Sequence, residues 1–167
     1  MPTPDVTSAV IRADRRVGAL ARDRVHAVPG GPEAARVIAD ATAPAFQLLV
    51  GALIVLPGSR VTGLRALAAG GAAATIARVA RESIDRPRPG ARTDGGFPSR
   101  HASSATAIAL VVARDRPLLG AVALVTAAAG LAARVASADH EPLDIAAGAV
   151  LGTAVARLMR RRRRRRS

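Results

Sequence analysis

Apolar residues fall into six stretches along the chain, separated by proline, glycine or charged residues. The first, within residues 1–29, mixes valine and leucine with arginine, which is typical of an amphipathic helix that ends at Pro29. Residues 85–98 are rich in proline, glycine and arginine and predict a loop. The other five stretches predict apolar helices over about 32–56, 61–84, 99–113, 118–137 and 142–159. No stretch alternates as a half-buried strand does, so the pattern predicts an all-α protein.

Helices that are apolar on nearly every face form either the core of a soluble bundle or membrane spans. A span needs about 20 residues, a length that 118–137 and 142–159 approach and 99–113 does not. Abundant alanine and glycine favour close packing in lipid, whereas the mean hydropathy of +0.22 and the lack of an aromatic belt favour the soluble alternative. We expect an integral membrane helical bundle of five to six helices, with an amphipathic N-terminal helix on the membrane or across it.

Composition divides the chain into three parts: an amphipathic helix over 1–30, a membrane-embedded helical domain over 31–159 and a polyarginine tail over 160–167. All 25 basic residues are arginine, and with 12 acidic residues they give a formal net charge of +13. The unbroken run from Arg160 to Arg166 suits an anionic membrane surface and acts as a determinant of topology.

Several function classes are excluded by composition. The chain has two aromatic residues, neither of them Trp or Tyr, so we expect no nucleic-acid partner that needs base stacking. Without cysteine there are no disulfides, zinc fingers or cysteine nucleophiles, and three histidines make a histidine-rich metal site unexpected. Residues 1–29 lack the uncharged apolar core of a signal peptide, so we do not expect one there.

Polar residues that could take part in catalysis or binding gather in three places: after the third helix, at the start of the fourth, and between the fifth and the sixth. If consecutive helices run antiparallel, all three places fall at one end of the bundle. They would form a single cluster there, made of Arg81, Arg88, Ser99, Arg100, His101, Arg134, His140 and Asp144.

This cluster has the chemistry of a phosphate site. Guanidinium groups make paired hydrogen bonds to phosphoryl oxygens, and a serine at a helix N-cap leaves backbone amides facing an anion. Of the two histidines, one can attack phosphorus while the other protonates the leaving oxygen. Asp144 follows His140 by one helical turn, so it can orient the imidazole. No carboxylate cluster suggests a metal, and we expect neither a metal nor a cofactor.

The three segments resemble the signature of the phosphatidic acid phosphatase type 2 family, the lipid phosphate phosphatases of the acid phosphatase–haloperoxidase superfamily. That signature reads Lys-x6-Arg-Pro, Pro-Ser-Gly-His and Ser-Arg-x5-His-x3-Asp, and the similarity covers about residues 60–160. The resemblance implies a helical bundle, usually of six spans, and metal-independent hydrolysis of a phosphomonoester or diphosphate through a phosphohistidine. By position, the nucleophile, acid and orienting carboxylate would be His140, His101 and Asp144. The residues that resemble the phosphate ligands are Arg81, Arg88, Ser99 and Arg134.

The chain departs from the family pattern at three positions. Arg81 replaces a lysine and keeps the positive charge, whereas Ala133 replaces a serine and loses a hydroxyl group. Arg100 replaces a glycine, so a bulky cation borders the expected pocket. We expect Arg100 to join the phosphate-binding group at the rim of the site and to favour a substrate with a second anionic group.

We therefore expect a multi-pass enzyme of a bacterial cell membrane that dephosphorylates a lipid phosphate, with an extracytoplasmic active site and a cytoplasmic arginine tail. Its expected partners are the lipid substrate and membrane lipids, and the sequence does not name the lipid. In a competing interpretation His140 and Asp144 only cap a helix, and the arginines anchor a non-enzymatic protein whose tail binds anionic lipid or nucleic acid. A soluble acid phosphatase of the same catalytic type is a narrower alternative.

Overall fold

A computed structural model of the chain describes residues 6–84, 89 and 95–164, and this part contains six α-helices and no strand. The helices match the six predicted stretches to within a few residues, and the last one, which was expected to end at Met159, continues into the arginine run. Arginine is a good helix former, which explains the extension. The helices are α1 (Val6–His26), α2 (Gly31–Val55), α3 (Arg60–Ser83), α4 (Arg100–Asp115), α5 (Pro117–Ala136) and α6 (Pro142–Arg164).

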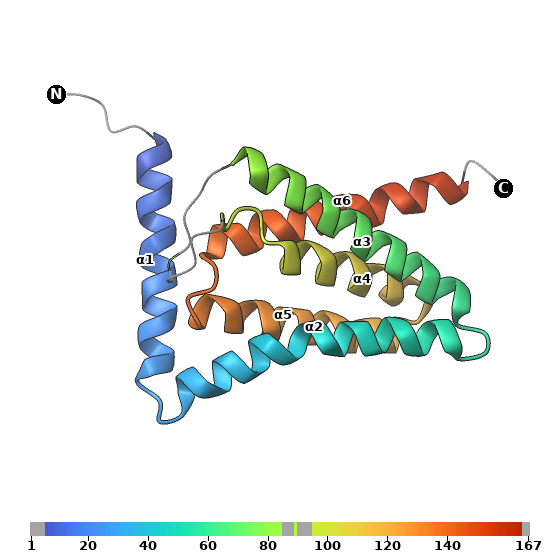
Figure 1. Cartoon of the computed structure of the whole chain (residues 1–167), viewed down its shortest axis with the longest axis horizontal. Helices are drawn as coiled ribbons and strands as arrows, with labels where there is room; N and C mark the ends of the chain where they lie inside the picture. Colours follow the sequence, from blue (N-terminus) through green and yellow to red (C-terminus); the bar gives the residue numbers. More distant parts are fainter. Residues whose placement is uncertain (1–5, 85–88, 90–94, 165–167) are drawn as a thin grey trace.

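The five apolar helices, α2 to α6, run side by side, while α1 stands across one end of the bundle (Figure 1). α4 is the central helix and packs against α2, α3, α5 and α6. Its apolar face meets α2 in a core that includes Phe46, Val50, Leu53, Ile108 and Val112. The expected all-α bundle with an amphipathic N-terminal helix is confirmed, and α1 lies crosswise rather than parallel to the other helices.

α4 and α6 approach each other closely because glycine lines their contact. A Cβ atom added at Gly148 would collide with the backbone of Ser99, and one at Gly152 would collide with the backbone of Ser103. The two glycines are four residues apart and therefore lie on one face of α6. This small-residue seam is the close packing that is common between helices in lipid.

The outer surface of the bundle exposes many large apolar side chains. Three helices, α2, α5 and α6, are long and apolar enough to cross a membrane, whereas α4 is only 16 residues long and α3 carries four arginines. Large side chains such as Leu48, Val55 and Leu118 are at least 75% exposed. Exposure of this kind suits contact with lipid, as expected for a membrane protein, and disfavours the soluble alternative.

Candidate active site

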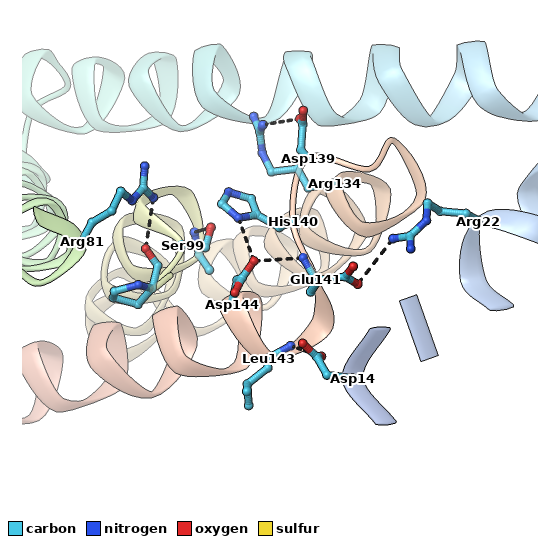
Figure 2. Close-up of polar contacts among 12 residues, drawn as sticks. Asp14, Arg22, Arg81, Ser99, Arg134, Asp139, His140, Glu141, Leu143 and Asp144 are labelled. Carbon is cyan, nitrogen blue, oxygen red and sulfur yellow. Dashed lines mark hydrogen bonds and ion pairs between the residues drawn. The ribbon is translucent and has the colours of Figure 1, made fainter. Parts of the chain in front are cut away.

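The ends of α3 and α5 and the starts of α4 and α6 meet at the end of the bundle where α1 stands (Figure 2). Antiparallel packing therefore brings together the three motif segments as predicted. Of the expected phosphate ligands, Arg88 lies outside the described residues.

Ser99 joins the second motif to the third. Its Oγ atom accepts a hydrogen bond from Ala102 N at 3.3 Å, which is the predicted N-cap of α4. Its backbone N–H donates to the carbonyl oxygen of Asp144 at 3.0 Å. Ser99 is fully buried, so the start of α4 and the first turn of α6 are held in a fixed relation.

His140 and Asp144 form the predicted pair. Nδ1 of His140 lies 3.5 Å from Oδ2 of Asp144, and each residue is 1% exposed. The same carboxylate oxygen accepts a hydrogen bond from Glu141 N at 3.0 Å, which anchors it at the start of α6 (Figure 2). With Nδ1 turned toward the carboxylate, Nε2 is the ring nitrogen that points away from it and suits attack on phosphorus.

A tight turn delivers His140 to this position. Ala138 adopts a left-handed conformation with φ of 59°, which costs roughly 1 kcal/mol for a residue with a Cβ. The turn directs the N–H groups of Asp139 and His140 to the carbonyl oxygen of Arg134, at 3.0 and 3.2 Å. These bonds satisfy the end of α5 and fix the histidine backbone.

Arg134 is a buried hub of the candidate site and is only 5% exposed. Its Nη1 lies 3.1 Å from Oδ2 of Asp139, and its Nη2 donates to the carbonyl oxygen of Ala39 in α2 at 2.9 Å. The sequence pattern indicated Arg134 as a phosphate ligand but did not indicate its partner Asp139. A second predicted ligand, Arg81, donates from Nη2 to the carbonyl oxygen of Pro98 at 3.1 Å.

A pocket of about 590 Å³ opens beside these residues between α2, α3, α4 and α5. Its polar end is formed by Arg100, His101 and Arg134, whereas His140 lies outside the pocket lining. The remainder of the lining is mainly apolar and includes Phe46, Val50, Leu67 and Ile108. The pocket thus offers cationic groups at one end and a hydrocarbon-like wall along the rest.

His101 lies at the start of α4, outside the three helices that are able to span a membrane. Burial, followed by the positive charges of Arg134 and Arg100, lowers its pKa to about 4. The imidazole is therefore neutral at pH 7 until an anion approaches, and the negative charge of a phosphate would favour its protonation.

Two polar contacts come from α1, where the sequence pattern indicated no site residue. Asp14 accepts a hydrogen bond from Leu143 N, and Arg22 pairs with Glu141 (Figure 2). Both contacts reach the segment that carries His140 and Asp144. Within the described part of the chain, no group of three or more histidine or carboxylate side chains could hold a metal ion.

The chain is similar to known proteins in sequence and in fold. The family model described as PAP2 superfamily matches residues 62–167. No curated protein matches the sequence significantly. Among solved structures, the fold is similar to that of a transmembrane PAP2 type phosphatidylglycerolphosphate phosphatase from Bacillus subtilis, with a TM-score of 0.73 and 21% identity over 94% of this chain and 87% of that one. Because the family model covers more than half of the chain, including all three motif segments, this membrane protein belongs to the PAP2 superfamily.

Proposed function

We propose that the protein hydrolyses a lipid phosphate or diphosphate without a metal, through a phosphohistidine at His140. Nε2 of His140 attacks phosphorus while His101 gives its proton to the leaving oxygen. In the second half of the reaction, neutral His101 takes a proton from a water molecule. The oxygen of that water attacks phosphorus, the bond from phosphorus to Nε2 of His140 breaks, and inorganic phosphate is released. Arginine side chains neutralise the charge that develops on the phosphoryl oxygens, a role that metals fill in other phosphatases.

The observation that carries this proposal is the buried His140–Asp144 pair, held at 3.5 Å beside Ser99 and Arg134 in a PAP2 family member. The pocket supports a lipid rather than a soluble phosphate ester. Its polar end contains His101, and its apolar walls would accept a hydrocarbon chain.

Phosphate release from defined lipids by the purified protein in detergent tests the proposal. The panel contains polyprenyl phosphate, polyprenyl diphosphate, phosphatidic acid and phosphatidylglycerol phosphate, each with and without EDTA. We expect release from at least one lipid, no effect of the chelator, and inhibition by vanadate, which mimics five-coordinate phosphorus. Loss of activity with EDTA and its recovery with magnesium would contradict a metal-free reaction.

The low pKa of His101 leads to a prediction about pH. Because the pKa lies at about 4, the free enzyme lacks the acid's proton near neutrality, and a singly protonated phosphate must bring that proton. We expect kcat/KM to fall tenfold per pH unit above the second pKa of the substrate phosphate, about 6. Substrates with lower second pKa values should shift the fall to lower pH by the same amount. A kcat/KM that stays constant to pH 8 would contradict this assignment.

Arg100 provides a prediction about substrate choice. It is exposed at the polar end of the pocket, next to His101, where a second anionic group of the substrate could reach it. We expect Arg100→Gly to raise KM for a polyprenyl diphosphate by about tenfold, a typical loss for one charge-assisted hydrogen bond, and KM for the monophosphate by much less. Equal changes with both substrates would contradict the rim role.

We further propose that the active site opens to the extracytoplasmic side of a bacterial cell membrane. α6 begins at the site and runs to the opposite end of the bundle, where its last residues belong to the arginine run (Figure 1). Positive flanking residues stay in the cytoplasm, and the seven arginines of Arg160–Arg166 outweigh those of α1 at the other end.

Cysteine labelling tests this orientation, and the chain has no native cysteine. His26 is exposed at the end of α1, on the site side, and Pro57 is exposed in the turn between α2 and α3 at the opposite end. In intact cells, His26→Cys should react with a membrane-impermeant thiol reagent, and Pro57→Cys should react only after lysis. The reverse pattern would place the chemistry in the cytoplasm.

A further inference from the structure

One face of α1 contacts the segment between α5 and α6. Asp14, Gly18 and Arg22 are spaced four residues apart and therefore lie along this face. Oδ1 of Asp14 accepts a hydrogen bond from Leu143 N at 2.8 Å, and Nη1 of Arg22 lies 3.5 Å from Oε2 of Glu141. A Cβ added at Gly18 would collide with the Glu141 carboxylate, so the glycine permits this close contact.

The first turn of α6 depends on this contact for one of its hydrogen bonds. The first N–H groups of a helix have no partner within the helix. Pro142 has no N–H, and the N–H groups of Asp144 and Ile145 donate to the carbonyl oxygen of Glu141, at 3.0 and 3.4 Å. The remaining donor, Leu143 N, is bonded by Asp14, a residue 129 positions away and only 9% exposed. Asp14 thus caps α6 from another helix, and its negative charge also suits the positive end of the helix dipole.

This cap lies next to the proposed nucleophile. Leu143 directly precedes Asp144, whose carboxylate lies 3.5 Å from Nδ1 of His140. A shift of the first turn of α6 would move that carboxylate away from the imidazole. Displacements of about 1 Å in an active site can lower the rate about 100-fold.

We propose that Asp14 is a positioning residue for the phosphatase reaction, acting through Leu143 N and Asp144 on His140. The inference rests on the proposed function, because it assigns Asp14 to the same nucleophile. Glu141 reinforces the contact: its side chain is only 5% exposed, and Arg22 is the cation beside it. Burial raises the pKa of the Glu141 carboxyl, and Arg22 opposes that shift. α1 is thus a working part of the site as well as an amphipathic helix.

The experiment compares Asp14→Ala, which removes the acceptor, with Asp14→Asn, which keeps an amide oxygen at the same place. Asp23→Ala is the matched control, because Asp23 is exposed on the same helix and makes no side-chain contact with the α5–α6 segment among the described residues. Rates are divided by the concentration of vanadate-binding sites, so that misfolded protein does not lower the measured kcat. Each variant is assayed with an alkyl phosphate lipid and with p-nitrophenyl phosphate, whose leaving group needs no acid.

We expect Asp14→Ala to lower kcat about 10- to 100-fold with both substrates by the same factor, with KM within about threefold of the wild type. Asp14→Asn should recover kcat to within about threefold, and Asp23→Ala should match the wild type. If Asp14→Ala does not fold, Asp14→Ser serves as the second variant, because its hydroxyl is one bond too short to reach Leu143 N and it should give the same pattern.

Three results would overturn the proposal. One is wild-type kcat in the Asp14→Ala variant, and another is an Asp14→Asn variant as slow as Asp14→Ala. The third is a loss seen only with the alkyl phosphate, since that would place the defect at His101 rather than His140. An inactive wild-type enzyme would instead overturn the proposed function, so the two failures are distinguishable.

Discussion

Replacing His140 with alanine is expected to abolish phosphate release, with a fall in kcat of at least about 10⁴-fold. The imidazole is the proposed nucleophile, and no other described nucleophilic side chain shares its position next to Asp144. Asp144→Asn should cost less, because the nucleophile remains and only its orientation is lost. Initial rates on the best lipid of the panel measure both effects, and a phosphoenzyme should be trapped in the wild type but not in His140→Ala.

The matched control is His26→Ala. His26 is exposed at the end of α1, so its loss should leave the rate unchanged. Circular dichroism and size-exclusion profiles that match the wild type establish that the His140→Ala protein is folded. Full activity in that variant would sink the nucleophile assignment and the phosphohistidine with it.

Loss of His101 should produce the second largest effect, and its size should depend on the leaving group. General acids contribute about 10²- to 10⁴-fold, so we expect His101→Ala to lower kcat by that range with a lipid alkyl phosphate. With p-nitrophenyl phosphate the leaving phenolate is stable without a proton, so the rate of p-nitrophenolate release in the first turnover should stay within about tenfold of the wild type. Steady turnover still needs His101 to take the proton of the attacking water. Parallel rate measurements on the two substrates make the comparison.

His140→Ala again supplies the contrast, because loss of the nucleophile should affect both substrates alike. An equally large loss of the first-turnover rate with both substrates in His101→Ala would contradict its role as the acid. Such a result would instead assign the residue to binding or to structure.

Much of the fold could be predicted because its determinants are local. Proline and glycine punctuate the apolar stretches, and the ends of α2 and α5 fall where those residues and the charged turns indicate. Ser99 is the N-cap of α4 because a serine before an apolar run satisfies the free amides of the helix start. Short loops make consecutive helices antiparallel, and this arrangement brings the three motif segments together at one end of the bundle.

Long-range contacts could not be predicted in the same way. The hydrogen bond from Arg134 to the carbonyl oxygen of Ala39 joins residues that are 95 positions apart. The spacing of apolar residues in α2 does not indicate which of its carbonyl oxygens lies near the Arg134 side chain. Asp14 looks like one more charge on an amphipathic helix, and only the crosswise placement of α1 reveals its partner, Leu143. The sequence pattern therefore gave the motif residues but missed the groups that hold them.

The glycine seam between α4 and α6 has a mechanical consequence. Gly148 and Gly152 set the backbone of α6 directly against the backbone of α4 at Ser99 and Ser103. Bilayers change thickness with lipid composition, and spans respond by tilting. We expect α4 and α6 to tilt as one rigid body, so that Ser99 and Asp144 keep their 3.0 Å backbone hydrogen bond in thin and thick bilayers alike. This rigid contact would keep the catalytic rate nearly constant when the thickness of the bilayer changes.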